Sequence, residues 1–214
     1  MGFLHFTTPS VTAETALSGR DTPVLPNPRP HTVLGTRIDA QPAEGHEEAY
    51  LALGCYWGAE KIFWELGAET TAVGFMGGYT KNPTYMEVCT GLTGHTETVR
   101  VVFDPATVSY AEILRAFFES HDPTTLNRQG NDRGTQYRSA IFATTAEQFE
   151  TAKRVRDLYQ DVLDTAGKGT IVTEIHEPGS VFYFAEDDHQ QYLDKNPSGY
   201  NCHSRTGLPC PIAR

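Results

Sequence analysis

The sequence has no long apolar run and few cysteines, and each shortage excludes a class of protein. None of its hydrophobic stretches approaches the roughly 20 residues that a membrane-spanning helix needs. The segment Met1–Phe6 has neither a basic start nor a sustained apolar run, so we do not expect a secretory signal. Four cysteines in 214 residues are too few for a disulfide scaffold. We therefore expect a globular protein of the cytoplasm with no membrane partner.

Basic residues are also scarce. The chain has 17 Lys and Arg against 27 Asp and Glu, which gives a formal net charge of −10. Such a surface repels polyanions, so we expect no nucleic-acid partner. The hydrophobic share of 39% and the chain length are those of one ordinary domain with an extension, long enough to bury a substantial core. We expect the protein to be a monomer.

The few cysteines are placed unevenly along the chain. One follows a predicted strand, one lies mid-chain and two lie near the end: Cys55, Cys89, Cys202 and Cys210. In a reducing compartment this placement favours a redox or catalytic use of the cysteines over structural disulfide bonds. The spacing fits no zinc pattern, so we expect no metal or other cofactor. We interpret Cys89 as a packed thiol, and His189 and His203 as surface groups.

Cys55 lies at a predicted turn from strand to helix. Ala49–Leu53 suits a buried strand, and Gly54 interrupts it. Apolar residues then recur at helical spacing: Ala59, Ile62, Phe63 and Leu66. The free N–H groups and positive dipole of a helix start favour a thiolate, so we expect a lowered pKa and a nucleophile at Cys55. A small buried hydrophobe is the alternative.

Further strands and helices alternate along the chain. We expect strands at Thr70–Phe75, His95–Asp104, Ser139–Ala143, Ile171–Ile175 and Val181–Phe184, helices after Ser109 and from Thr145 to about Asp164, and a short helix at Asp187–Asp194. Residues 76–96 read as a long ordered loop, and 124–137 as a polar loop. This order predicts an α/β protein with helices packed on a sheet. We divide it into a Pro-rich arm (1–45), a catalytic α/β domain (46–195) and a flexible redox tail (196–214).

Glu97 falls on an apolar strand face. By the period of two it shares that face with Val99, Val101 and Phe103. Burial of a carboxyl disfavours its charged form and raises its pKa, which suits a general acid near neutral pH. A solvated position at the strand end is the alternative.

Gly54–Gly58, with the order Gly-Cys-Tyr-Trp-Gly, resembles the signature of the peptide methionine sulfoxide reductase A family. Tyr56 stands where the family usually has Phe. Further stretches resemble the family in the same order: Gly77–Tyr85, Gly94–Glu97, Gly130–Arg138 and Ala185–Tyr192. The resemblance spans about Tyr50 to Tyr200. It implies a two-layer α/β (α+β) fold with a mixed sheet, related to the ferredoxin-like split βαβ plait, with long non-regular N- and C-terminal extensions.

The resemblance also implies reduction of the S epimer of methionine sulfoxide, free or in proteins, as repair after oxidative damage. Its residues would be Cys55 as nucleophile, Glu97 as acid, Tyr85 and Tyr137 as hydrogen-bond donors to the oxygen, Tyr56 and Trp57 as walls of a methyl pocket, and Asp132 as a polar support of the substrate. The resulting sulfenic acid would condense with Cys202, and Cys210 would pass the disulfide to a thioredoxin-type reductant. In some family members the resolving cysteine directly follows Gly-Tyr, whereas here Asn201 intervenes. Pro209 and Pro211 favour an extended, accessible Cys210.

Two other functions remain open at this point. A cysteine hydrolase or acyltransferase also places its nucleophile at a helix start, but it needs a histidine base and has no use for the two tail cysteines. A redox-sensing binding module would use the cysteines as a switch and turn over nothing. Only sulfoxide reduction consumes one dithiol for each methionine formed.

Overall fold

The computed structural model describes residues 11–201 and 204–211. These residues form β1 (Glu47–Leu53), α1 (Tyr56–Leu66), β2 (Thr70–Met76), α2 (Tyr85–Cys89), β3 (Thr96–Phe103), α3 (Tyr110–Ser120), β4 (Arg128–Gln129), β5 (Asp132–Arg133), the 3₁₀ turn η1 (Thr135–Tyr137), β6 (Ser139–Phe142), α4 (Ala146–Thr165), β7 (Glu174–His176), β8 (Tyr183–Phe184) and α5 (Tyr192–Lys195). Across that range no helix combines the length and apolarity that crossing a membrane requires.

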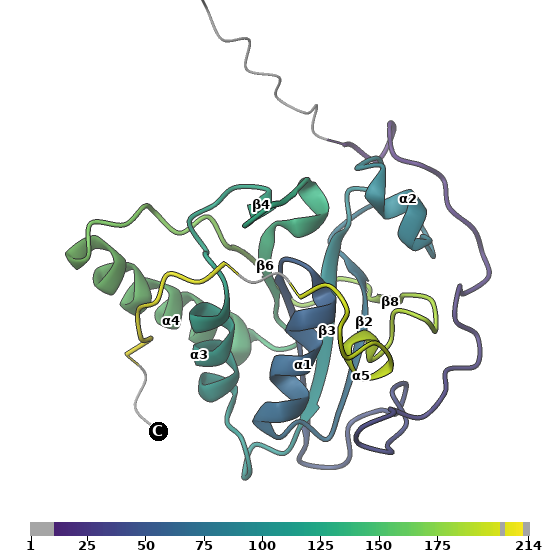
Figure 1. Ribbon diagram of the computed structural model, residues 1–214, viewed down its shortest axis with the longest axis horizontal. Coiled ribbons are helices and arrows are strands. Elements are labelled where there is room, and N and C mark those ends of the chain that lie inside the picture. Colours follow the sequence, from purple (N-terminus) through teal and green to yellow (C-terminus); the bar gives the residue numbers. More distant parts are fainter. Residues whose placement is uncertain (1–10, 202–203, 212–214) are drawn as a thin grey trace, which may run out of the picture.

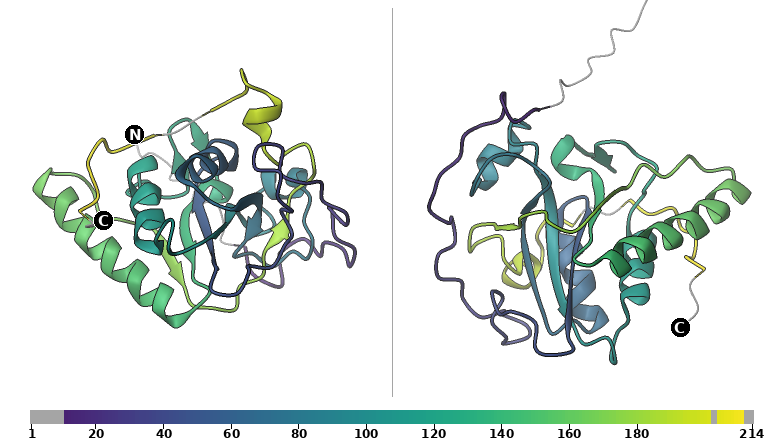
Figure 2. Two further views of the ribbon diagram at one scale, coloured as in Figure 1. Left: turned by 90° about the horizontal axis from the view of Figure 1, so that it is seen from below. Right: turned by 180° about the vertical axis from the view of Figure 1, so that it is seen from behind.

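One mixed sheet of six strands organises the molecule, in the order β7-β6-β1-β3-β2-β8. Neighbouring strands are antiparallel except β6 and β7, which are parallel. Helices α1 and α3 lie on one face of the sheet, and α4 packs beside α3 (Figure 1). The view from below shows this layering edge-on (Figure 2). The expected mixed α/β architecture is confirmed.

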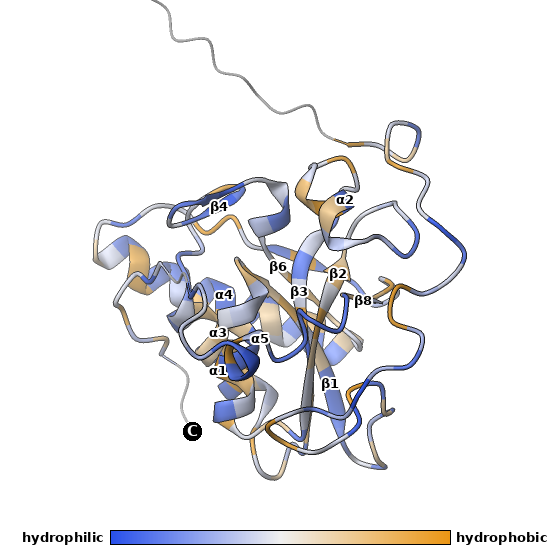
Figure 3. Ribbon diagram, turned by 45° about the vertical axis from the view of Figure 1, so that its right-hand side comes forward, coloured by the Kyte–Doolittle hydropathy of each residue, from blue (hydrophilic) through white to orange (hydrophobic). Residues whose placement is uncertain are grey.

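Both faces of the central strands are covered. Every residue of β2 and β3 is buried. The main core fills the space between the sheet and the helices, and a smaller cluster that includes Ala52, Met76 and Phe142 lies apart from it. Coloured by hydropathy, the sheet carries apolar stretches through the centre of the molecule (Figure 3). Because β3 is buried along its whole length, a charged side chain on it must find its partners inside the protein.

The turn between β1 and α1 depends on one glycine. Gly54 has φ +98°, and a Cβ there would lie 2.7 Å from Cγ of Gln129. Backbone strain and contact with a buried side chain both exclude a larger residue. The turn places Cys55 as the N-cap of α1, and Gly67, with φ +111°, ends the helix. The predicted strand-turn-helix is confirmed.

The described part of the N-terminal arm follows the surface without forming a helix (Figures 1 and 2). Arg20 donates to Glu87 Oε1 of α2 and to the backbone oxygen of Asn82, each at 2.8 Å. Farther along, Arg100 of β3 donates to the backbone oxygens of Ile38 and Ala40 at 2.8 and 2.7 Å. These contacts fasten the arm to the sheet and to α2. The sequence also suggests Phe3, Leu4 and Phe6 as anchors of this arm, and these lie outside the described residues.

Four short elements differ from the sequence prediction. The long loop contains α2, a single turn held by a capping box between Thr84 and Glu87. Strand β7 begins three residues later than predicted, because the N–H of Ile171 donates to Gln160 Oε1 and not to a strand. Strand β8 is only two residues long, and α5 begins at Tyr192, five residues after the predicted start. Elements this short are too brief for hydrophobic periodicity to reveal.

Candidate active site

Cys55 is buried at the start of α1, with 6% of its surface exposed. The N–H groups of Trp57 and Gly58 lower the pKa of its thiol, as the helix-start argument requires. Burial and the nearby carboxylates of Glu97 and Asp132 raise that pKa by more, so the net shift is upward. The prediction of a lowered pKa is therefore wrong for the resting protein, in which Cys55 is a thiol.

Glu97 is the second residue of β3 and is 2% exposed. Its Oε2 accepts a hydrogen bond of 3.0 Å from the backbone N–H of Tyr56, the residue that follows Cys55. Burial is the main cause that raises the pKa of Glu97 to about 8, against the opposing hydrogen bond from the Tyr56 N–H, and the charge of Asp132 adds to the increase. The predicted buried position is confirmed, and the solvated alternative is excluded. A carboxyl of this kind holds its proton at neutral pH.

Tyr85 and Tyr137 are half-buried near this carboxyl. Burial, and after it the charge of Glu97, raises the pKa of both phenols, so both remain protonated donors. The backbone N–H of Tyr85 donates to Glu186 Oε1 at 3.0 Å, which fixes the first turn of α2. Cys89, one turn later, hydrogen-bonds to the Tyr85 phenol. The predicted packed thiol is thus only half-buried and touches a candidate residue.

A cluster of aromatic rings surrounds Trp57. Tyr192 stacks on its indole with ring centroids 3.8 Å apart. The indole N–H donates to Nδ1 of His189 at 3.1 Å, and the hydroxyl of Tyr56 lies 3.0 Å from the same atom. Tyr85 packs on His189 with centroids 4.3 Å apart. The side chains of two distant chain segments therefore meet around one indole.

His189 is not the surface group that the sequence suggested. It is packed between rings, and burial is the main cause that lowers its pKa. Because Nδ1 accepts from Trp57, the proton of the neutral ring lies on Nε2. The imidazole acts here as a hydrogen-bond acceptor that orients the indole.

Asp132 lies on β5 beside this cluster. Its Oδ1 accepts a hydrogen bond of 2.9 Å from the hydroxyl of Tyr200. Its Oδ2 is buried and has no hydrogen-bond partner among the described residues. A buried carboxylate oxygen without a donor is costly, so this atom is suited to accept a donor from a ligand.

Cys210 is buried between α3 and α4, 5% exposed. Its backbone N–H donates to Glu119 Oε1 at 2.8 Å. Tyr159 holds the preceding residues, because its hydroxyl donates to the backbone oxygen of Leu208 at 3.1 Å. Burial and then Glu119 raise the pKa of the Cys210 thiol to about 12. The expected accessible presentation is wrong for this conformation, and Cys202 lies outside the described residues.

Sequence reasoning gave no role to four residues that shape the site: Glu60, Glu186, His189 and Gln191. Glu60 follows Tyr56 by four residues and precedes Phe63 by three, so helical spacing places it on a buried stripe of α1. The other three fall in Ala185–Tyr192, a stretch whose family resemblance was noted without roles for its members. Of these four residues, only Glu60 could have been identified from helical spacing in the sequence.

Comparisons with known proteins identify relatives of this chain. A family profile described as "Peptide methionine sulfoxide reductase" matches residues 47–209. A peptide methionine sulfoxide reductase MsrA of Corynebacterium kroppenstedtii is 53% identical, with 98% of this chain and 100% of the relative covered. The solved methionine sulfoxide reductase A of Corynebacterium diphtheriae has a TM-score of 0.84 at 49% identity, covering 96% of this chain and 99% of that one.

A more distant relative is known from yeast. Mxr1 of Saccharomyces cerevisiae in its reduced form has a TM-score of 0.70 at 34% identity, with 78% of this chain and 95% of that chain covered. The same protein has also been solved in complex with Trx2; that alignment, 20% identical with a TM-score of 0.51, shows the fold alone. The family match and these relatives are independent of the pKa shifts and contacts described above.

Proposed function

This chain belongs to the peptide methionine sulfoxide reductase A family, and we propose that it reduces the S epimer of methionine sulfoxide, free or in proteins, to methionine. Membership of the family makes it an oxidoreductase. One observation carries the proposed mechanism: the backbone N–H after Cys55 binds the carboxyl of Glu97, which keeps a thiol and a protonated acid side by side.

The first step transfers oxygen from the substrate to the enzyme. The sulfur of Cys55 attacks the sulfoxide sulfur, and Glu97 supplies the proton that lets the oxygen leave. The attack forms an S–S bond, and the thiol proton of Cys55 replaces the proton that Glu97 gave. The hydroxyl then moves from the substrate sulfur to the sulfur of Cys55 as the S–O and S–S bonds break, which leaves a sulfenic acid on Cys55 and releases methionine. Tyr85 and Tyr137 donate hydrogen bonds to the oxygen while negative charge develops on it. Their protonated phenols beside Glu97 support this role.

Substrate binding falls to the aromatic residues and Asp132. Tyr56 and Trp57 form the apolar wall for the S-methyl group, where sulfur–aromatic contact contributes. Their mutual ring distance of 6.5 Å and the stacked Tyr192 support a rigid wall. Oδ2 of Asp132, which has no hydrogen-bond partner in the described part of the chain, accepts a donor from the polar part of the substrate.

The tail resets the enzyme. The sulfenic acid of Cys55 condenses with the thiol of Cys202 and releases water, and Cys210 then displaces Cys55 from that disulfide. A thioredoxin-type reductant reduces the Cys202–Cys210 bond, as the yeast complex of Mxr1 with Trx2 suggests for that relative. Since Cys210 is buried at rest, the tail must leave α3 and α4 before the exchange.

The order of exchange has a direct test. Cys210→Ser should keep its activity with dithiothreitol, accumulate a Cys55–Cys202 disulfide and lose most of its thioredoxin-supported turnover. Peptide mapping after one equivalent of substrate identifies the bond. A Cys55–Cys210 disulfide that forms first in the wild type would remove the resolving role from Cys202.

The fold proposal is finer than the mixed sheet itself. We propose that β6, β1, β3 and β2 with α1 and α3 form a ferredoxin-like split βαβ plait, extended at both ends by non-regular segments. The support is that β3 lies between β1 and β2, and β1 lies between β3 and β6, so two crossovers each skip one strand. The cytoplasmic location and the monomeric state also remain predictions.

Turnover with a counted reductant tests the function. With each separated epimer of a methionine sulfoxide peptide, we expect one dithiol consumed per methionine formed for the S epimer and no turnover of the R epimer. Hydrolysis or acyl transfer would consume no dithiol, and a redox sensor would stop after one equivalent. Either result would refute the proposal, and turnover of both epimers would refute the stereochemical part.

A further inference from the structure

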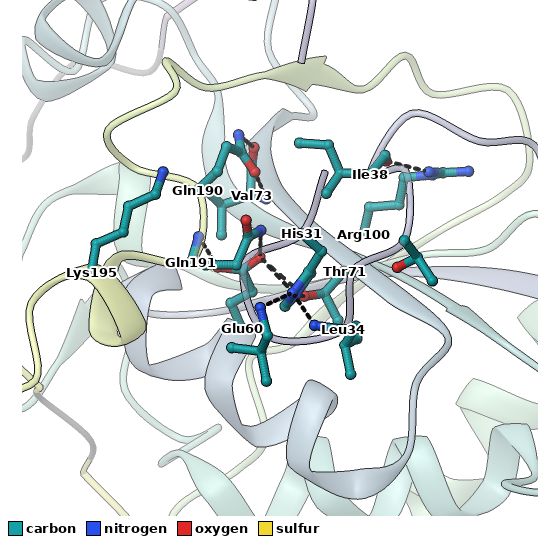
Figure 4. A network of polar contacts seen from close by, with 12 residues as sticks. His31, Leu34, Ile38, Glu60, Thr71, Val73, Arg100, Gln190, Gln191 and Lys195 are labelled. Atoms are coloured by element: carbon teal, nitrogen blue, oxygen red, sulfur yellow. Dashed lines mark hydrogen bonds and ion pairs between the residues drawn. The ribbon is translucent and has the colours of Figure 1, made fainter. Parts of the chain in front are cut away.

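A buried polar network is centred on Glu60 of α1 (Figure 4). This side chain of α1 is 0% exposed and accepts three hydrogen bonds. The backbone N–H of Gln191 donates to its Oε2 at 2.8 Å, and the side-chain amide of Gln191 donates to its Oε1 at 2.7 Å. The hydroxyl of Thr71 donates to Oε1 at 3.0 Å. Two of these three donors belong to one residue, Gln191.

The backbone of Gln191 is in a conformation that it would not adopt without support. Its φ is +48°, in the left-handed region that is strained for residues other than glycine. Gln191 is also the residue before α5, so its backbone angles set the direction of Tyr192. The two hydrogen bonds to Glu60 hold both the backbone and the side chain of this strained residue.

Two residues close to Gln191 in the chain, His189 and Tyr192, contact the indole of Trp57. Tyr192 stacks on its face, and His189 accepts its N–H. Trp57 and Glu60 are three residues apart on α1, so they lie on neighbouring positions of the same helix surface. Through its hydrogen bonds to Gln191, Glu60 thus connects the segment His189–Tyr192 to helix α1, which carries Trp57.

The other side of the network leads to the N-terminal arm. Nδ1 of His31 accepts the N–H groups of Val33 and Leu34 at 3.1 Å, so its proton lies on Nε2 and is donated to Thr71 at 2.9 Å. Burial raises the pKa of Glu60 to about 7, and the ionised form, which prevails above that pH, accepts from every donor that faces it. The contact between Glu60 and Gln191 is therefore part of a fully bonded chain that runs from the arm to the aromatic cluster.

We propose that Glu60 is a positioning residue for substrate binding, which acts through Gln191 to fix Trp57 between Tyr192 and His189. The inference rests on the proposed function, since Trp57 is there a wall of the methyl site. Glu60 takes no part in the transfer of oxygen. Its loss should weaken substrate binding and leave the chemical step largely intact.

Single-turnover kinetics separate these two effects. For Glu60→Gln, the concentration of methionine sulfoxide peptide that gives half the maximal rate should rise about tenfold, as for the loss of a charge-assisted hydrogen bond. The maximal rate of sulfenic-acid formation should stay within about threefold of wild type. Glu48→Gln is the matched control: Glu48 forms an ion pair with Arg100 and lies near the start of β1, at the other end of that strand from Cys55. The control should bind substrate as wild type does.

Two further variants keep the test decisive. Gln191→Asn tolerates the left-handed backbone and keeps the backbone donor, but its shorter side chain loses the amide contact, so it should also weaken binding even if Glu60→Gln folds poorly. Glu60→Gln with Gln191→Glu reverses the donor and the acceptor, and should bind better than either single variant. A swap no better than the worse single variant would overturn the proposal, as would unchanged binding in a folded Glu60→Gln or Gln191→Asn.

A readout without turnover separates this inference from the function beneath it. Trp57 and Trp64 are the two tryptophans of the chain, so a Trp64→Phe background reports Trp57 alone. Glu60→Gln should shift the emission of Trp57 and increase its quenching by acrylamide, and Glu48→Gln should do neither. An unchanged emission would overturn the positioning role. A wild-type protein that does not reduce methionine sulfoxide would instead refute the proposed function.

Discussion

At the scale of single residues, Cys55 and Glu97 depend on each other for their protonation states. Burial makes both groups hold their protons, and the charged form of either one disfavours the charged form of the other. A resting site with a thiol and a carboxylic acid can give up one proton to the sulfoxide oxygen as the S–O bond breaks. The raised pKa values that argue against a resting thiolate are thus consistent with acid-assisted oxygen transfer.

The nucleophile is tested by removing its sulfur. Cys55→Ser should abolish reduction of methionine sulfoxide even with excess dithiothreitol, because a hydroxyl is too weak a nucleophile toward sulfoxide sulfur. Cys89→Ser should retain nearly the wild-type rate, since its thiol only touches the Tyr85 phenol. Methionine formation is measured by chromatography. Substantial turnover by Cys55→Ser would refute the central assignment.

The acid is tested by its pH profile. Because Glu97 must be protonated and its pKa is about 8, the single-turnover rate should fall as the pH rises through about 8. Glu97→Gln should be slower at neutral pH by roughly 10²–10⁴-fold and should lose this alkaline limb, with a smaller deficit at low pH where solvent supplies protons. Rapid-quench detection of sulfenic acid gives the rates. Equal profiles in the two proteins would leave Glu97 a structural role only.

At the scale of elements, the tail packs against helix α4, and the proposed disulfide exchange requires this contact to open. Tyr159 of α4 donates to the backbone oxygen of Leu208 and contacts the hydroxyl of Thr206. Farther along, Glu119 of α3 accepts the N–H of Cys210. Apolar packing of Leu208 and Cys210 adds to these hydrogen bonds, but the segment lies at the edge of the core, so its local opening costs less free energy than global unfolding.

Loosening the contact between the tail and α4 should expose Cys210. In a background with the other three cysteines replaced by serine, Tyr159→Phe should raise the rate of Cys210 alkylation by iodoacetamide several-fold, about what the loss of one or two hydrogen bonds gives. Tyr110→Phe is the matched control, because the Tyr110 hydroxyl is buried without a partner among the described residues. Mass spectrometry follows the modification. Equal rates in the two variants would show that Tyr159 does not restrain the tail.

At the scale of the whole molecule, the buried acid makes the fold less stable as pH rises. The pKa of Glu97 is about 8 in the folded protein and near 4.5 when unfolded, so between these values the folded state binds more protons. Stability therefore falls as the pH increases from about 4.5 to 8. The loss of stability arises because Glu97 lies on β3, where every residue is buried and the ionised carboxyl is poorly solvated.

Comparison with Glu97→Gln isolates this effect from other titrating groups. The free energy of unfolding of the wild type, relative to that of the variant, should decrease by up to about 3 kcal/mol between pH 5.5 and 8. Urea titrations at several pH values supply the difference. Parallel stability curves for the two proteins would mean that the Glu97 pKa is ordinary in the fold.

Much of the fold followed from local patterns. The strand before Cys55, the glycine turn, the helix after it and the capping box at Ser109 were all predictable, because each depends on neighbours within a few residues. Glu97 was also predictable as a buried acid, since its register with the valines of β3 is a local property of the chain. The one-turn α2 was missed, and the strand at β8 was predicted two residues too long. Elements this short form through partners far away in the sequence.

The amino-acid sequence alone determined which residues are chemically competent: a cysteine at a helix start, an acid on an apolar strand and aromatic residues beside the cysteine. Only the tertiary structure decided their state. The pKa of Cys55 depends on burial and on carboxylates about 40 and 80 residues away, which outweigh the helix start. The same holds for Trp57, whose indole is fixed by His189 and Tyr192 from the far end of the chain, and for Cys210, which is buried despite its flanking prolines. Solvation and charge act through space, so a linear pattern names the reacting atoms but not the environment that sets their protonation.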